Sequence, residues 1–143
     1  KYKLTTLSRG TQVMPTIQSV PGVIQIAQGA DITITPTTLN YQGNTAGSTS
    51  ETAGYQFTIS DVRAFSTFNG SGGTNTEQQT SMNASETFGT NVSKTVIGTT
   101  LNMTATTVPT LFNSNETIFT TLIIEGRDSR ARIQIPVQIN KSK

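Results

Sequence analysis

Asparagines followed two positions later by Ser or Thr are the side chains of this chain best suited to covalent chemistry. Such Asn-X-Ser/Thr motifs (sequons) accept N-linked glycans and mark the surface of a secreted protein. A chain rich in Ser and Thr also forms them by chance, so their weight depends on exposure. The 143 residues contain six sequons, at Asn69, Asn83, Asn91, Asn102, Asn115 and Asn140. We therefore expect a glycosylated extracellular protein.

Catalytic side chains are scarce. The chain has no His and no Cys, which removes the most common general base, the thiol nucleophile and the usual ligands of transition metals. The glycine-rich stretch 70–73 lacks the Lys and the helix of a phosphate-binding loop. No recognised calcium-loop spacing occurs among the eight carboxylates, which are Asp31, Glu51, Asp61, Glu77, Glu86, Glu116, Glu125 and Asp128. We expect no catalytic residue, cofactor, metal site or enzyme activity.

The lysines offer covalent chemistry of another kind. An amine held against an Asn or Asp side chain in a dry core, near an acid, forms an isopeptide bond without an enzyme. Such a bond would replace the disulfides that a chain without Cys cannot form. The candidates are Lys1, Lys3 and Lys94, and the alternative is that these lysines are simply solvated.

The overall composition is polar but uncharged. Apolar residues make up 33% and charged residues 13% of the chain, both below the usual globular shares. The abundant Thr suits a half-exposed β-sheet. The net charge of +2 comes from scattered Lys and Arg, which disfavours nucleic-acid binding. No apolar run has the length of a membrane span, and the start at Lys1 is that expected of a mature, processed chain.

Apolar residues alternate with polar ones in several short segments, which predicts strands. The segments are 23–27, 31–35, 55–60 and 101–106, followed by a hairpin of 118–125 and 130–139 around the loop 126–129. Pro136 places the last strand at an edge or a bulge. The polar stretches 42–53 and 69–80 are expected to be surface loops. Together these signals predict one all-β domain, an immunoglobulin-like antiparallel β-sandwich.

This pattern places every sequon at the surface. Asn102 falls on the polar face of the strand 101–106, and Asn115 in the turn before the next strand. Asn69, Asn83 and Asn91 fall in expected loops, and Asn140 lies near the chain end.

The first twenty residues differ from the rest. One interpretation makes them the irregular first strand of the same sandwich. The other makes residues 1–20 a tail that adds a strand to a neighbouring subunit, with 21–143 as the head domain. In that case the anchoring side chains are Tyr2, Leu4, Leu7 and Val13, because strand addition combines main-chain hydrogen bonds with side-chain pockets. Pro15 and Pro21 would stiffen the linker.

The chain resembles subunits of the archaeal thread filaments, which are extracellular surface fibres. The resemblance rests on the start Lys1-Tyr2-Lys3-Leu4, the segment before Pro21-Gly22, the Ile32-Thr33-Ile34-Thr35 strand, the six sequons and the absence of Cys. It implies an immunoglobulin-like head, an N-terminal donor strand inserted into the next subunit, dense N-glycosylation and isopeptide cross-links.

We therefore expect a structural subunit of an extracellular, cell-surface filament, which polymerises head to tail with identical copies and serves adhesion or cell–cell contact. Its other expected partners are covalent glycans. One alternative is a monomeric β-sandwich binding module, such as an adhesin or carbohydrate-binding domain, using Tyr41, Phe65 and Phe68. Another is a tiling surface-layer or viral coat component.

Overall fold

The computed structural model describes residues 14–41, 51–69, 75–89, 92, 94–109 and 116–141. Within these ranges the chain is all-β, as predicted, with one short helix, α2 (Ala84–Phe88). The strands are β1 (Thr16–Gln18), β2 (Ile24–Ala27), β3 (Asp31–Ile34), β4 (Thr37–Leu39), β5 (Tyr55–Ile59), β6 (Val62–Asn69), β7 (Asn75–Met82), β8 (Thr95–Gly98), β9 (Leu101–Thr104), β10 (Glu116–Gly126) and β11 (Arg132–Asn140).

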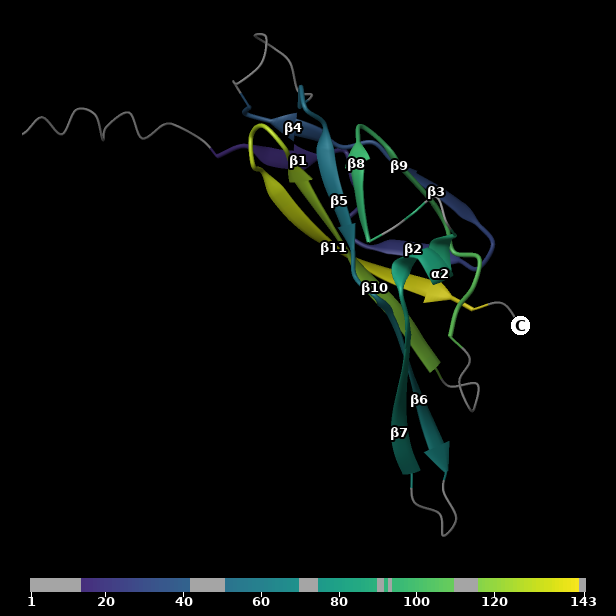
Figure 1. The fold of residues 1–143 in the computed structure, drawn as a ribbon. Coiled ribbons are helices and arrows are strands. Elements are labelled where there is room, and N and C mark those ends of the chain that lie inside the picture. Colours follow the sequence, from purple (N-terminus) through teal and green to yellow (C-terminus); the bar gives the residue numbers. More distant parts are fainter. Residues whose placement is uncertain are drawn as a thin grey trace, which may run out of the picture.

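Seven strands form the main sheet (Figure 1). Its order is β2-β11-β10-β5-β8, and β6 extends it by pairing with β10 and β7. Every pair is antiparallel except β2 with β11, which run parallel. The predicted antiparallel arrangement therefore holds for all but this pair. Its two strands come from opposite ends of the head and are not joined by a hairpin.

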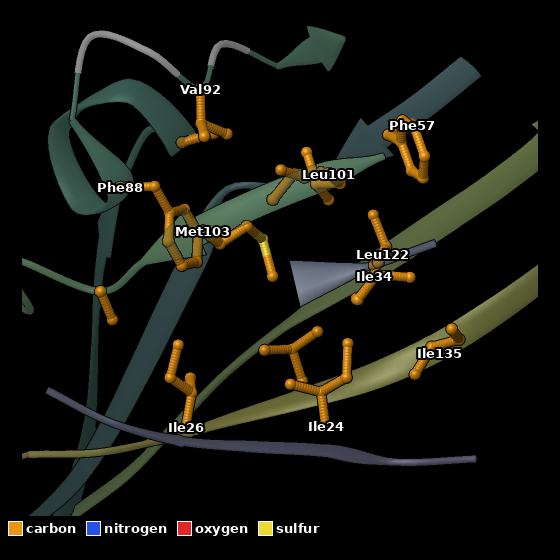
Figure 2. Close-up of a cluster of buried hydrophobic side chains, with 14 of the residues drawn as sticks. Ile24, Ile26, Ile34, Phe57, Phe88, Val92, Leu101, Met103, Leu122 and Ile135 are labelled. Carbon is orange, nitrogen blue, oxygen red and sulfur yellow. The ribbon is translucent and has the colours of Figure 1, made fainter. Parts of the chain in front are cut away.

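Two smaller sheets, β1-β4 and β3-β9, complete the fold. Side chains from both join those of the main sheet in one buried cluster. Figure 2 shows Leu101 and Met103 of β9 beside Phe88 of α2, with Ile24 and Ile135 nearby. No sheet can bury its apolar face alone, so the packing of the two smaller sheets against the main sheet supplies the core. The immunoglobulin-like topology remains a prediction.

The C-terminal hairpin forms as predicted. Strands β10 and β11 pair from Phe119 opposite Gln138 to Glu125 opposite Arg132. Pro136 faces Thr121, whose carbonyl accepts a hydrogen bond from the backbone N–H of Ser60 on the opposite side. The missing N–H of Pro136 therefore points away from β10, and pairing with β2 starts only at residue 137. Pro136 thus lies at a local edge, where proline is tolerated.

The prediction of a surface loop over 69–80 is wrong. Residues 75–82 form β7, which pairs with β6 along its whole length, from Asn75 opposite Asn69 to Met82 opposite Val62. The two strands project away from the rest of the chain (Figure 1). The sequence of β7, NTEQQTSM, lacks apolar alternation, so main-chain pairing with β6 prevails over its low strand propensity.

The structure describes only the last part of the expected N-terminal tail, residues 1–20. Residues 16–18, which the sequence pattern assigns to the tail, form β1, pair with β4 and bury Ile17 in the core. Residues 1–13 lie outside the described part of the chain, and so do the expected donor residues Tyr2, Leu4, Leu7 and Val13. Of the other predicted loop, 42–53, the structure describes residues 51–53, where Thr52 and Ala53 form a turn.

Candidate functional site

A hollow lined by both apolar and polar residues opens between α2, β3, β8 and β9, and we call it the β8–β9 hollow. Its volume is about 520 Å³. Apolar side chains from three elements line it, among them Phe88, Val96, Leu101 and Met103. Figure 2 shows Phe88 of α2 beside Met103 of β9, with Val92 above both. Because Phe88, Leu101 and Met103 are almost fully buried, polar groups nevertheless make up the larger share of the exposed surface of the hollow.

Unpaired strand edges border this hollow. Among the described residues β8 pairs with β5 alone, and β9 pairs with β3 alone. In the described part of the chain, each of these two strands therefore has one edge along which no further strand is paired. Ile97 of β8 remains 54% exposed. An open strand edge beside apolar side chains is the geometry into which an extended peptide can add.

Helix α2 forms one wall of the hollow. A capping box fixes its start and Gly89 ends it. The side chain of Asn83 accepts a hydrogen bond from the Glu86 backbone N–H at 2.8 Å, and the Glu86 carboxylate accepts from the Asn83 backbone N–H at 3.1 Å. This capping box satisfies two donors that a helix start leaves open. The helix ends at Gly89, whose φ of 88° favours glycine. Phe88 is thereby held in the core.

The rim along β3 and β9 is a ladder of side-chain hydrogen bonds. Thr33 Oγ1 donates to Asn102 Oδ1 at 2.8 Å, and Asp31 Oδ1 accepts from the Thr104 hydroxyl. One pair further along, the hydroxyls of Thr35 and Thr100 lie 3.2 Å apart. These polar pairs stabilise the two-stranded sheet.

Three predicted glycan acceptors have exposed side chains: Asn83, Asn102 and Asn140. In Asn83 and Asn102 the carboxamide oxygen accepts the hydrogen bonds, so the nitrogen that would carry a glycan is not needed as a donor. Asn69 ends β6, whereas the sequence predicts a loop there. Asn91 and Asn115 lie outside the described residues.

A second polar site, centred on Glu51, is one that the sequence does not reveal. Glu51 is only 3% exposed. Its carboxylate accepts hydrogen bonds from Thr38 Oγ1 (2.7 Å), Ser129 Oγ (2.6 Å) and the backbone N–H groups of Ser129 (2.8 Å) and Asp128 (3.0 Å). Because Thr38 donates its single proton to Glu51, the Tyr55 hydroxyl, 2.8 Å from Thr38, is the donor to Thr38.

Burial and hydrogen bonding shift the pKa of Glu51 in opposite directions. Burial alone raises the pKa of a carboxyl group, but the donors from Ser129, Thr38 and Asp128 outweigh it and hold the pKa of Glu51 below its ordinary 4.5. Burial also raises the pKa of Tyr55 above 10.0. The carboxylate therefore stays ionised and joins β4 to the turn after β10. We call this group of residues the Glu51 cluster.

Of the other predicted site residues, the structure describes Lys94, Phe65 and Phe68. Lys94 is exposed, so among the described residues it does not meet the dry surroundings that an isopeptide bond needs. Lys1 and Lys3 lie outside the described part. Phe65 and Phe68, expected in a loop, belong to β6.

Of the two missed features, helix α2 has a signal in the sequence and the Glu51 cluster does not. Asn83-Ala84-Ser85-Glu86 has the spacing of a capping box, which predicts a helix start. Gly126-Arg127-Asp128-Ser129 predicts only a turn, and nothing local indicates that Glu51 is its partner.

Across the described ranges, no three of the His, Cys, Asp and Glu side chains are grouped so as to hold a metal ion. In the same ranges no helix has the length and apolar character needed to cross a membrane. No protein-family model matches the sequence, and no curated protein matches it. What the chain does must therefore be inferred from its own geometry.

Proposed function

We propose that this chain is a structural subunit of an extracellular filament, in which the N-terminal segment of one copy adds a strand to the head of the next. The observation that carries the proposal is the β8–β9 hollow, a site of about 520 Å³ beside two strands that each pair with one neighbour only in the described part of the chain. Such an edge is a liability in a secreted protein unless something covers it.

The N-terminal segment is a suitable occupant. Tyr2, Leu4 and Leu7 supply apolar side chains, while an added strand would satisfy the backbone groups of β8 or β9. Segment and hollow are different surfaces, so their contact is heterologous and propagates into an open fibre. The immunoglobulin-like sandwich that we infer for the head is a fold that such strand addition would complete.

Glycans would occupy the sides of this fibre. The exposed Asn83 and Asn140 lie at the start of α2 and at the end of β11, whereas Asn102 lies on β9 at the rim of the hollow, where a glycan would border the added strand. Such bulky, solubilising groups are compatible only with solvent-facing positions. A coat of this kind suits a cell-surface fibre that mediates adhesion or cell–cell contact.

Removal of residues 1–13 tests the proposal. The shortened head retains its hollow but has no donor, so it should form no fibres under the electron microscope. Added in small amounts to the full chain, it should occupy growing ends and shorten the fibres. A full-length chain that stays globular at all concentrations, or fibres that the shortened head leaves unchanged in length, would contradict the proposal.

The hollow itself supports a second candidate function. Its volume lies within the roughly 300–1,000 Å³ of small-molecule sites. Asp31, Thr33 and Asn102 on its rim carry the hydroxyl, amide and carboxylate groups that saccharides bind. A carbohydrate-binding module would show saturable binding of a saccharide that persists after removal of residues 1–13, which a glycan array and calorimetry would detect.

A further inference from the structure

The sequon at Asn102 is held by the fold at each of its three residues. Asn102, Met103 and Thr104 all belong to β9, which pairs with β3. The carboxamide oxygen of Asn102 accepts a hydrogen bond from Thr33 Oγ1 at 2.8 Å, and the Thr104 hydroxyl donates to Asp31. Met103, between them, is only 2% exposed and belongs to the core (Figure 2). The exposure of Asn102 therefore hides how firmly its neighbours are fixed.

The sequon at Asn140 is placed differently. Asn140 is the last residue of β11, and the middle residue of its sequon, Lys141, is exposed and lies beyond the strand. The carbonyl of Asn140 accepts a hydrogen bond from the backbone N–H of Gln28 at 2.8 Å. This bond stands at the end of the ladder, where local opening costs least. Lys141 can leave the surface of the head without uncovering the core.

Transfer of an N-glycan requires the transferase to reach the Asn nitrogen and the hydroxyl at the third position of the sequon together. In the reaction Asn102 Nδ2 bonds to the anomeric carbon of a sugar, and the bond from that carbon to the phosphate of a lipid-linked donor breaks. The phosphate leaves with the electron pair, and the amide loses one proton. For this the Thr104 hydroxyl must leave Asp31 and Met103 must leave the core, so β9 must separate from β3.

The separation of β9 from β3 is rare in the folded head because it exposes apolar surface. Leu101 is 1% exposed and Met103 is 2% exposed. Loss of burial of one such side chain shifts an equilibrium by roughly tenfold to a hundredfold. Exposure of both makes the open form of β9 scarcer by roughly a hundredfold or more. At Asn140 no comparable side chain has to be uncovered.

We propose that Asn102 receives its glycan only before β9 pairs with β3, whereas Asn140 can still receive one on the folded head. Strand β3 precedes β9 in the chain, so the partner of β9 is already present when Asn102 is synthesised. Strand pairing and glycan transfer therefore compete for the same segment. A chain in which β9 pairs first keeps an unmodified Asn102.

This order does not depend on the filament function. Under that function it has a consequence for the fibre, because Asn102 lies at the rim of the β8–β9 hollow. Subunits with and without a sugar beside the added strand would enter the same fibre, in a ratio that is set during folding and is not changed afterwards.

Glycan transfer in vitro tests the proposal on the full chain. The chain is made in a host without N-glycosylation and is then incubated with a transferase that recognises Asn-X-Ser/Thr and with its lipid-linked donor. Synthetic peptides of residues 97–107 and 135–143 present the two sequons without the fold. Mass spectrometry gives the rate of modification at each Asn, and each rate in the folded chain is divided by the rate of its own peptide. Circular dichroism checks that the chain is folded.

We expect the ratio for Asn102 to be roughly a hundredfold or more below the ratio for Asn140, because only Asn102 requires Leu101 and Met103 to be exposed. Equal ratios for the two sites would overturn the proposal. So would a folded chain that modifies Asn102 as fast as the peptide does, or one in which Asn140 is as slow as Asn102. Both outcomes would leave the proposed head-to-tail assembly unaffected.

Discussion

The Glu51 cluster and the β8–β9 hollow differ in how completely their polar groups are paired. At Glu51, four donors from β4 and from the turn after β10 converge on one buried carboxylate. At the hollow, β8 and β9 each pair with a single strand among the described residues. Since proteins normally pair backbone polar groups, the Glu51 cluster stabilises the fold, whereas the hollow is where we propose that a partner strand adds.

Removing the carboxylate from the complete site should have the largest effect. Glu51→Ala leaves the Thr38 and Ser129 hydroxyls and two backbone N–H groups without their acceptor. A buried donor left unsatisfied costs roughly 1–3 kcal/mol, so we expect a loss of about 3 kcal/mol in the free energy of unfolding, measured by urea denaturation.

The matched control is Glu125→Gln, because the half-buried carboxylate of Glu125 is 3.4 Å from the exposed guanidinium of Arg130. It should change the free energy of unfolding by less than about 1 kcal/mol. A Glu51→Ala variant as stable as this control would show that the cluster does not stabilise the fold.

A methyl group at Gly126 should disturb the same cluster sterically. A Cβ at this position would lie 2.5 Å from Glu51 Cδ and 2.7 Å from Ser129 Oγ. We expect Gly126→Ala to destabilise the chain by about 1–3 kcal/mol, read as a lower Tm. Gly22→Ala, where nothing lies within 4 Å, should be nearly neutral, and equal Tm values for the two variants would refute the close packing.

The low pKa of Glu51 predicts that the fold loses stability at acidic pH. Because its pKa is lower in the folded than in the unfolded state, ionised Glu51 stabilises the fold above about pH 4.5. This contribution is lost as the pH falls through the lower, folded-state pKa. Glu51→Gln should remove that part of the pH dependence of unfolding, whereas an unchanged pH profile would mean that another group is responsible.

The smallest expected effect comes from two variants that separate the roles of Asn83 as helix cap and as predicted glycan acceptor. Asn83→Ala removes both the helix cap and the sequon, and loss of such a cap costs about 1 kcal/mol. Ser85→Ala removes the sequon but keeps the hydrogen bond from the Glu86 N–H to Asn83. In unglycosylated protein only Asn83→Ala should lower the Tm. In protein from a glycosylating host, mass spectrometry should find one glycan fewer with either variant.

The sequence predicts those elements whose side chains alternate. Ile133, Ile135, Val137 and Ile139 repeat every second position, which is enough to place β11 and its hairpin partner. Strand β7 carries no such repeat and exists because β6 pairs with it.

The sites are less predictable than the strands because long-range packing creates them. Glu51 lies 77 and 78 positions from its donors Asp128 and Ser129, and no local pattern links them. The hollow likewise depends on where β8 and β9 lie relative to α2. The exposure of Asn83, Asn102 and Asn140 could be expected, because sequons in polar surroundings lie at the surface.

Hydrogen exchange on the head lacking residues 1–13, with and without a synthetic peptide of residues 1–13, tests the central claim most directly. We predict that the peptide, and not a scrambled version of it, slows exchange at the backbone amides of β8 and β9. Unchanged exchange in β8 and β9, or protection confined to another edge such as β2 or β7, would contradict the assignment of the hollow as the site of strand addition.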